Sequence, residues 1–319
     1  MIGRICGTGA YIPDNYLDNN DLAEMVETND EWIQERTGII RRHVIEEDTT
    51  VSMAVKAAGR AMSMGGLKAE ELDLIIVATV SSNIVLPSAA CQVQKELGAV
   101  NATCFDMNAA CTGFMFGYIA AQAYIAAGMY RKILIIGSES LSNYINWKDR
   151  GTCILFGDGA GAAVLCAKEG TVYQSATHSD GDSGRYLTCN SRHNKGWDAV
   201  EPDDTYIKMD GQAVFKFAVK KVPQVIDEVL TKNQMDIQEI DWFILHQANK
   251  RIIDSIAKRL GADRDKFPTN VEEYGNTSSA SIPILLDEMN RKEMLKPGQK
   301  IMMAGFGAGL SWGAAILTW

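Results

Sequence analysis

Continuous apolar runs alternate with amphipathic segments along this chain of 319 residues. The run Leu72–Val80 is apolar apart from Asp73 and Thr79, and Lys132–Gly137 is apolar after its first residue, as in strands buried on both faces of a sheet. The Ala-rich stretch Thr50–Met64 has the periodicity of an amphipathic helix. Buried strands that alternate with helices predict an α/β fold.

The same patterns predict the remaining elements. Further strands are expected at Ile2–Ile12, Thr103–Asp106, Ile240–Leu245, Lys300–Ala304 and the end of the chain. Two more strands are expected around the Gly-rich turn within Cys153–Cys166. Helices are expected at Asn20–Glu27, within Thr28–Ile39, and at Pro87–Leu97, Gln212–Asn233, Arg251–Gly261 and Ser281–Leu295. The polar stretch from residue 171 to about 209 predicts a long surface loop.

The segment Phe105–Gly128 predicts a helix that is buried on every face, with Cys111 at its N-terminus. The free N–H groups and the helix dipole at that end stabilise an anion, so Cys111 is a candidate nucleophile that reacts as a thiolate at neutral pH. The alternative is a small core residue, which is the commoner role of a cysteine in an apolar run.

Short motifs recur at one constant offset. Asp73 corresponds to Asp241, Lys132 to Lys300 and Asn108 to Asn276, each pair being 168 residues apart. A fixed offset across separated motifs indicates two duplicated halves. We therefore expect an N-terminal half, residues 1–170, which carries the nucleophile, and a C-terminal half, residues 171–319.

The duplication predicts how distant residues meet. The turn at Cys111 and the turn at Asn276 become counterparts that face each other between the halves, where clefts form. His246 follows a predicted strand, at the end of the sheet where α/β proteins place their sites. A cysteine, a histidine and an asparagine in one cleft suit acyl-thioester chemistry: cysteine accepts the acyl group, and the other two stabilise an enolate oxygen. Alone, His246 fits a structural histidine and Asn276 a turn residue.

Composition narrows the class of protein. A net charge of −9 argues against non-specific binding of nucleic acid. Seven cysteines without framework spacing fit a reducing compartment, and the scattered histidines give no zinc site. No signal peptide or membrane span is expected, because the N-terminus lacks a charged and apolar leader and the longest apolar run is short. We expect a soluble, cytoplasmic enzyme without metal or redox cofactor.

Cys111 stands in AACTGF, His246 in HQAN and Asn276 in GNTS, and GFGAGLSWG lies close to the end of the chain. These motifs resemble those of the thiolase-fold condensing enzymes, and among them the β-ketoacyl-acyl carrier protein synthase III family. The resemblance extends over essentially the whole chain. It implies a homodimer with duplicated halves in a layered αβαβα architecture.

The resemblance also implies a reaction: decarboxylative Claisen condensation that initiates fatty-acid synthesis. Cys111 takes the primer from an acyl-CoA, which is a substrate and not a cofactor. His246 and Asn276 stabilise the carbanion formed when malonyl-acyl carrier protein loses carbon dioxide. The backbone N–H groups of Cys111 and Ala308 form the oxyanion hole, with Ala308 where the family usually has Gly.

Further residues acquire roles by the same resemblance. Leu86 stands where the family often has Phe and is expected to limit the primer pocket. Primers larger than acetyl are then expected to fit, unless a bulky neighbour compensates. The expected CoA-binding residues are Trp32, Arg36, Arg150, Asn249 and Arg251, with Asn249 either touching pantetheine or orienting the His246 loop. The expected binding residues for acyl carrier protein are Gln247, Lys250, Arg251, Lys258, Arg259 and Lys216, although basic residues on helices more often form a solvated face.

Three alternatives to this function remain at the level of sequence. A related condensing enzyme or acyltransferase of polyketide or secondary-metabolite assembly would use the same acyl-Cys111, with residues 177–204 altering the acceptor. Simple acyl transfer without condensation would release no carbon dioxide. A carrier-binding protein without turnover would have no need of intact Cys111, His246 and Asn276.

Overall fold

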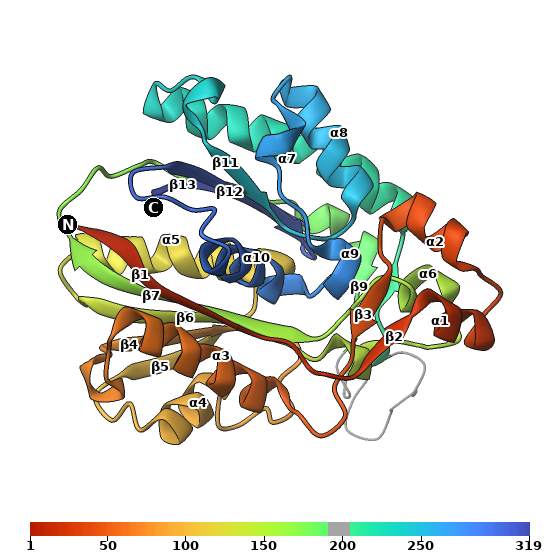
Figure 1. Ribbon diagram of the computed structural model, residues 1–319, viewed down its shortest axis with the longest axis horizontal. Helices are drawn as coiled ribbons and strands as arrows, with labels where there is room; N and C mark the ends of the chain where they lie inside the picture. Colours follow the sequence, from red (N-terminus) through yellow and green to blue (C-terminus); the bar gives the residue numbers. More distant parts are fainter. Residues whose placement is uncertain (191–204) are drawn as a thin grey trace.

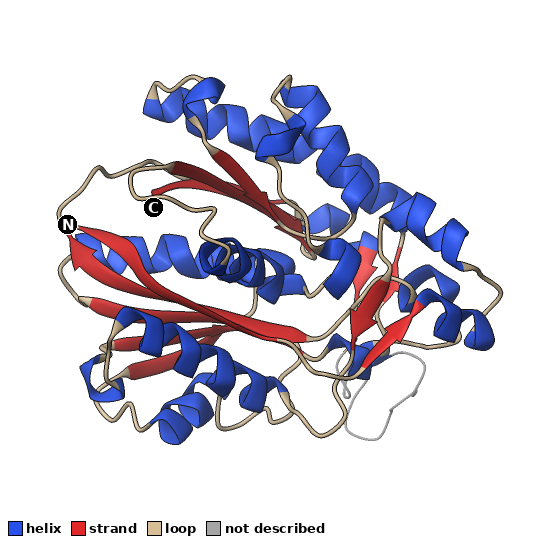
Figure 2. Ribbon diagram, viewed as in Figure 1, coloured by secondary structure: helices blue, strands red, loops and turns tan. Residues whose placement is uncertain are grey.

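The computed structural model describes residues 1–190 and 205–319. Two sheets lie on either side of a central pair of helices, and further helices cover both outer faces, so that the layers run α, β, α, β, α (Figures 1 and 2). This arrangement is the layered α/β architecture expected from the sequence. Among the residues described, none of the helices combines the length and apolar character that crossing a bilayer requires.

The first sheet has five strands in the order β1-β7-β6-β4-β5. Strands β4, β5 and β6 are mutually parallel, whereas β7 runs antiparallel to both β1 and β6. Strand β4 is wholly buried and β6 is buried after its first residue, and both lie inside the sheet, as their continuous apolar runs predict. The bounds of the strands are β1 Ile2–Tyr11, β4 Leu74–Ala78, β5 Thr103–Met107, β6 Lys132–Glu139 and β7 Gly159–Lys168.

The second sheet has four strands in the order β11-β12-β13-β8, with β11 and β12 parallel. Its central strands β12 and β13 form a long antiparallel hairpin around residues 308–310. The bounds of the strands are β8 Ala176–Ser179, β11 Trp242–Leu245, β12 Lys300–Gly307 and β13 Ser311–Thr318. Short strand pairs flank the two sheets: β2 Tyr16–Asp18 with β3 Arg41–His43, and β9 Leu187–Thr188 with β10 Lys208–Met209.

The central helices are α5, Gly113–Ala126, and α10, Ser281–Arg291. One hydrophobic core combines both of them with residues of both sheets, for example Ile135 of β6 and Met303 of β12. Gly117 allows α5 to lie close to the first sheet, because a Cβ there would meet the Ile135 side chain at 3.1 Å. The uniformly apolar sequence of α5 is thus explained by burial between two sheets.

The outer helices cover the remaining faces of the sheets. The first sheet is covered by α3, Thr50–Gly65, and α4, Ala89–Leu97, and the second by α7, Gly211–Asn233, and α8, Lys250–Leu260 (Figure 1). The smaller helices are α1 Asn19–Met25, α2 Asp30–Thr37, α6 Arg150–Cys153 and α9 Val271–Tyr274.

The offset of 168 residues holds in three dimensions. β6 begins at Lys132 and β12 at Lys300, while α5 begins at Gly113 and α10 at Ser281. The polar contacts recur as well. Lys132 pairs with Glu71, as Lys300 pairs with Glu239. Equivalent elements thus carry equivalent contacts, as a duplication implies.

Two local expectations were wrong. The segment Cys153–Cys166 contains the end of the short helix α6 and the single strand β7, because the Gly-rich residues begin one long strand that packs against α10. Within the predicted surface loop, Ala176–Ser179 forms strand β8, whose backbone pairs with β13 at the edge of the second sheet. Residues 191–204 of that predicted loop, and with them much of the segment 177–204 considered for acceptor choice, lie outside the described residues.

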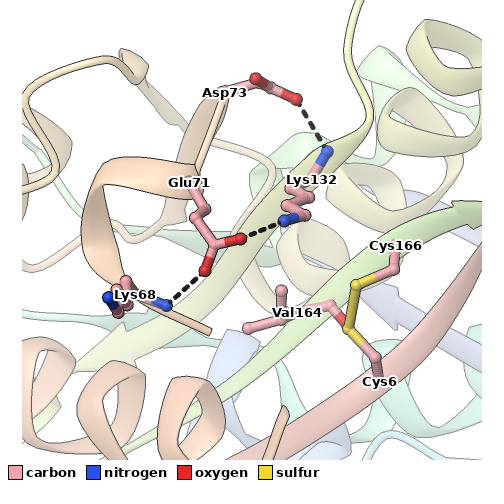
Figure 3. Close-up of a disulfide and its surroundings, with 7 residues drawn as sticks. All are labelled: Cys6, Lys68, Glu71, Asp73, Lys132, Val164 and Cys166. Carbon is pink, nitrogen blue, oxygen red and sulfur yellow. Dashed lines mark hydrogen bonds and ion pairs between the residues drawn. A yellow bond between two sulfur atoms is a disulfide. The ribbon is translucent and has the colours of Figure 1, made fainter. Parts of the chain in front are cut away.

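A disulfide joins the first sheet's two neighbouring strands β1 and β7. Cys6 and Cys166 are bonded, with their Cα atoms 6.1 Å apart (Figure 3). Cys6 lies where the register of the two strands shifts, between Ile5 and Gly7. The figure also shows the Lys132–Glu71 ion pair at the beginning of β6. The expectation of reduced cysteines does not hold for this pair.

Candidate active site

Cys111 lies in a single 3-10 turn, Ala110–Thr112, immediately before α5. The preceding Ala110 has a φ of 45°, a left-handed conformation that residues with a Cβ rarely adopt. Gly307 at the end of β12 lies close to this turn, since a Cβ on it would be 2.9 Å from the Cys111 backbone nitrogen. The strained turn and the glycine together bring the thiol to the boundary between the halves.

His246 follows β11 directly and is almost completely buried. Its Nδ1 lies 2.7 Å from the Ser281 hydroxyl, which also accepts a hydrogen bond from the Gln247 backbone N–H. The ring of Phe306 meets the imidazole edge to face, with centroids 5.5 Å apart. Burial lowers the pKa of His246 to about 3, so the imidazole is uncharged at neutral pH.

Hydrogen bonds fix the backbone N–H, the backbone carbonyl and the side chain of Asn276. Its N–H donates to the carbonyl of Leu155, and its carbonyl accepts from the N–H of Gly157. Its Oδ1 accepts a 2.9 Å hydrogen bond from the Ser278 backbone N–H. Oδ1 is thus used within the turn, whereas Nδ2 has no hydrogen-bond partner among the described residues and can donate to a ligand.

Cys111, His246 and Asn276 line one cavity of about 640 Å³. This first cavity also carries Arg36, Lys216, Asn249 and Arg251 in its wall. The structure therefore brings together the three residues that the sequence analysis combined, although they come from both halves of the chain.

A second cavity, of about 910 Å³, also reaches Cys111. Its wall includes Ala308, beside the apolar side chains of Leu141, Tyr144 and Ile207. Cys111 thus lies where a cavity lined in part by cationic side chains adjoins a cavity whose described wall carries no charged side chain. From this position a thiol can meet a thioester that is charged at one end and apolar at the other.

Trp32, Arg36 and Arg150 form one cluster on the surface. The guanidinium groups of Arg36 and Arg150 lie 4.3 and 4.7 Å from the centroid of the Trp32 ring. Arg36 lines the first cavity, whereas Trp32 and Arg150 lie beyond its wall. An aromatic ring with two cations is suited to a flat, phosphate-bearing ligand.

Asn249 has a structural use for both polar atoms of its side chain. Its Oδ1 caps α8 by accepting from the Arg251 N–H, and its Nδ2 donates to the carbonyl of Arg36. Of the two roles expected for Asn249, these contacts favour orienting the loop after His246 over touching pantetheine.

The basic residues expected to bind a carrier protein divide into two groups. Lys216, Arg251, Lys258 and Arg259 are exposed on α7 and α8, and two of them line the first cavity. Lys250 is engaged in an ion pair with Glu272 at 2.8 Å.

Gln247 is not a surface residue, contrary to expectation. It is 1% exposed, its Nε2 donates to the Leu245 carbonyl and its Oε1 accepts from the Asn270 N–H. A buried amide satisfied in this way cannot contact a carrier protein, so its proposed binding role was wrong. The polar character of Gln247 serves the loop after His246 instead.

Leu86 lies outside both cavities of its own chain. It is 83% exposed, next to Val85 at 88%. The expectation that Leu86 lines the primer pocket is therefore not met within one chain.

The resting state of Cys111 also differs from expectation. Burial raises the pKa of its thiol to about 12, a hydrogen bond from the Ser278 side chain lowers it, and the charge of Glu139 raises it further. The free-energy cost of burying the thiolate charge exceeds the stabilisation that the helix N-terminus gives to that charge. Cys111 is therefore a protonated thiol in the resting protein.

Sequence reasoning missed Ser281, Ser278 and Glu139. Each contacts a residue of the site: Ser281 contacts His246, Ser278 contacts Asn276, and Glu139 binds the Ser278 hydroxyl. The repeat contained a signal for the two serines, since Ser278 lies in the counterpart of the Cys111 turn and Ser281 begins the counterpart of the helix that follows it. Glu139 gave none, because it ends an apolar strand far from any motif.

Comparisons with known proteins agree on one family. Residues 105–181 match the family model described as 3-oxoacyl-[acyl-carrier-protein (ACP)] synthase III, and residues 230–319 match the model of its C-terminal part. A β-ketoacyl-[acyl-carrier-protein] synthase III of Clostridium novyi is 47% identical, covering 99% of this chain and 98% of the relative.

Solved structures agree with the sequence comparison. The 3-oxoacyl-[acyl-carrier-protein] synthase III of Aquifex aeolicus superposes with a TM-score of 0.94 at 40% identity, over 99% of this chain and 100% of the other. The priming β-ketosynthase of the R1128 polyketide pathway has a TM-score of 0.94 at 33% identity, over 99% and 96%. The thiolase fold and the class of condensing acyltransferases are confirmed, and the higher identities favour synthase III over the polyketide alternative. The chain belongs to the β-ketoacyl-[acyl-carrier-protein] synthase III family.

Proposed function

We propose that this chain condenses a primer acyl-CoA with malonyl-acyl carrier protein and so initiates fatty-acid synthesis. The observation that carries the proposal is the convergence of Cys111, His246 and Asn276 on one cavity. A thiol can hold the acyl group there while two uncharged hydrogen-bond donors wait for the second substrate.

In the first half-reaction the Cys111 sulfur attacks the thioester carbonyl of the acyl-CoA. The carbon–sulfur bond to CoA breaks, and the proton of the Cys111 thiol leaves on the CoA thiol. Because the resting thiol is protonated, it loses its proton in the same step in which the new sulfur–carbon bond forms. The N–H groups of Cys111 and Ala308 stabilise the tetrahedral oxyanion. A backbone donor tolerates Ala in place of Gly at position 308.

In the second half-reaction the malonyl group loses carbon dioxide, and the electron pair of the broken bond becomes an enolate on the remaining thioester. His246, uncharged because it is buried, and the Nδ2 of Asn276 donate hydrogen bonds to the enolate oxygen. The enolate carbon then attacks the acyl-Cys111 carbonyl. The β-ketoacyl carrier leaves, and the cysteine thiolate takes up a proton.

The two cavities suit the two ends of the primer. We place CoA in the first cavity, with its adenine and phosphates at Trp32, Arg36 and Arg150 and its chain passing Arg251. The acyl chain enters the second cavity, whose apolar wall has room for more than an acetyl group. The proposed chemistry uses CoA thioester as substrate and needs neither a metal nor a redox cofactor.

The acyl carrier protein approaches over α7 and α8. The exposed side chains Lys216, Arg251, Lys258 and Arg259 offer positive charge to an acidic partner in a protein that is itself acidic overall. Their helices border the first cavity, so a carrier bound there delivers its pantetheine arm to Cys111.

The working form is a cytoplasmic homodimer. Ile84, Val85 and Leu86 are exposed side by side, and β5 lies at the edge of the first sheet. An exposed apolar loop beside an open sheet edge is a surface that a second subunit can cover. We propose that Leu86 limits the primer in the second subunit's cavity.

Intact mass spectrometry tests the proposal. Incubation with acyl-CoAs from acetyl to octanoyl should add one acyl group to the chain and none to Cys111→Ala, and malonyl-carrier should then release carbon dioxide and yield β-ketoacyl-carrier. Acylation without carbon dioxide release would indicate simple acyl transfer. Absence of any adduct would overturn the proposed nucleophile.

A further inference from the structure

Glu139 is a fully buried carboxyl group at the boundary between the two halves. It is the last residue of β6 and has 0% exposure. A buried carboxyl is costly unless hydrogen bonds satisfy it. Burial raises the pKa of this carboxyl, and hydrogen bonds from Ser81, Val80, Ser279 and Ser278 lower it.

One oxygen of Glu139 faces its own half. Oε2 accepts from the Ser81 hydroxyl at 2.6 Å, the Val80 N–H at 3.1 Å and the Thr79 hydroxyl at 3.3 Å. These residues follow β4, and Val80 lines the second cavity beside Cys111. The same segment leads into the exposed loop that ends at Leu86.

The other oxygen faces the opposite half. Oε1 accepts from the Ser278 hydroxyl at 3.1 Å and the Ser279 hydroxyl at 3.0 Å. The backbone of Ser278 has a φ of 49°, so its surroundings must hold it in a left-handed conformation that costs about 1 kcal/mol or more. From that conformation the Ser278 N–H reaches Oδ1 of Asn276.

The repeat shows that this carboxyl is specific to one half. The counterpart of Glu139 at the end of β12 is Gly307, where a side chain would strike the Cys111 backbone. One strand end thus leaves space for the nucleophile, and the other carries a side chain that reaches the turn of the donor Asn276. The glutamate and the glycine thus differ where one half contributes the donor Asn276 and the other contributes the nucleophile Cys111.

We propose that Glu139 is a positioning residue for decarboxylation: acting through Ser278, it holds the turn that aims the Asn276 carboxamide, and it ties that turn to the segment Thr79–Ser81 beside the second cavity. The inference rests on the proposed role of Asn276 as an enolate donor. Glu139 contacts no substrate atom in this scheme. It acts on the second half-reaction. Its loss should not slow acylation, because the charge of Glu139 raises the pKa of the Cys111 thiol.

The experiment measures the two half-reactions separately in Glu139→Gln, Ser278→Ala and their double variant. Glutamine keeps the size but places an NH₂ donor among hydroxyl and amide donors. We expect decarboxylation of malonyl-carrier to fall by about 30-fold or more in kcat with KM little changed, while acylation falls by less than about threefold. The double variant should lose no more than Glu139→Gln alone, because both changes break one connection.

Asp287→Asn is the matched control. Asp287 is another buried carboxyl, bound to Thr8 and Arg291 away from the cavities. Its variant should lose stability without altering the ratio of the two rates, and thermal unfolding of each variant sets a common assay temperature. If Glu139→Gln fails to fold, Ser278→Ala carries the test, with decarboxylation again expected to fall alone.

Several outcomes would overturn the inference. They are equal losses in both half-reactions, a rate ratio like that of Asp287→Asn, or additive losses in the double variant. Failure of the wild-type chain to become acylated or to release carbon dioxide would instead refute the proposed function itself.

Discussion

The hydroxyl of Ser281 lies 2.7 Å from Nδ1 of His246. Because that hydroxyl accepts from the Gln247 N–H, its own proton is available to Nδ1, which leaves Nε2 as the N–H donor. Ser281 also begins α10, the counterpart of the helix that follows Cys111. The tautomer needed to stabilise an enolate is therefore set from the central layer of the fold.

Removing this contact should impair the second half-reaction. In Ser281→Ala the imidazole loses its orienting partner, and we expect decarboxylation to fall about 10- to 100-fold while acylation stays within about threefold. Stopped reactions with radiolabelled malonyl-carrier and intact mass of the acyl-enzyme give the two rates. Ser281→Thr, which keeps the hydroxyl, should recover part of the loss, and equal rates for both variants would contradict the tautomer assignment.

Burial of His246 also makes stability depend on pH. Its pKa is about 3 in the folded chain against 6.5 for an unperturbed histidine, so the unfolded state takes up a proton first as the pH falls. Stability is therefore lost progressively below pH 6.5 and down to about 3, by about 2 kcal/mol at pH 5. Chemical denaturation at pH 7.5 and 5 should show a smaller loss for His246→Gln than for the wild type. An identical pH dependence would show that His246 already ionises in the folded state.

The alkylation rate of Cys111 should depend on pH as expected for a thiol that is protonated at neutral pH. Since burial raises its pKa to about 12, the rate of alkylation by iodoacetamide should keep rising with pH through 9 and show no plateau near neutrality. Peptide mass spectrometry assigns the label to Cys111 among the free cysteines. A plateau below pH 8 would mean that the helix N-terminus lowers the pKa of the thiol by more than burial raises it.

Gly307 leaves no room for a side chain beside the nucleophile. A Cβ there would approach the Cys111 nitrogen to 2.9 Å, which is backbone and cannot move aside cheaply. We expect Gly307→Ala to reduce acylation by about 100-fold or more, because the proposed oxyanion donor is displaced. Gly59→Ala in α3 is the control: its Cβ would meet nothing within 4 Å, and it should stabilise the helix by about 0.5–1 kcal/mol with normal activity. Near-normal acylation by Gly307→Ala would place the oxyanion elsewhere.

Charge reversal on α8 tests carrier docking. The double change Lys258→Glu and Arg259→Glu should raise KM for malonyl-carrier about tenfold and leave acylation by acyl-CoA unchanged, with the effect shrinking as salt increases. Lys95→Glu on α4 of the other outer layer is the matched control and should leave both unchanged. Equal effects on the carrier and on acyl-CoA would indicate a general electrostatic change and refute docking on α8.

The sequence predicted most of this fold because its strongest patterns have simple causes. Continuous apolar runs became the inner strands β4 and β6, and the segment Phe105–Gly128, predicted to be buried on every face, contains the central helix α5. The repeat was readable because the ion pair of Lys132 with Glu71 requires the same residue types as that of Lys300 with Glu239. The β8 strand was missed because its polar sequence is stabilised by backbone pairing with β13, which no local pattern records.

Residues of the site were predictable where chemistry restricts the residue type. A thiol, an imidazole and a carboxamide in recognisable motifs indicated Cys111, His246 and Asn276. The family resemblance assigned Gln247 to carrier binding, yet the side-chain amide of Gln247 is hydrogen-bonded to the backbone of Leu245 and Asn270. Glu139 could not be predicted, because its role depends on a contact with Ser278 of the other half, 139 residues away in the sequence.

The glycines at the centre have a consequence for motion. Gly137 of β6 presses against the Ser279 carbonyl, where a Cβ would come within 2.3 Å, and Gly307 of β12 presses against the backbone of Cys111. Each half thus supplies the surface on which the other half's turn rests. The two halves therefore cannot move apart about a hinge, because their separation would remove the support of both turns. Substrates must enter and leave through the cavities while the two halves remain in contact.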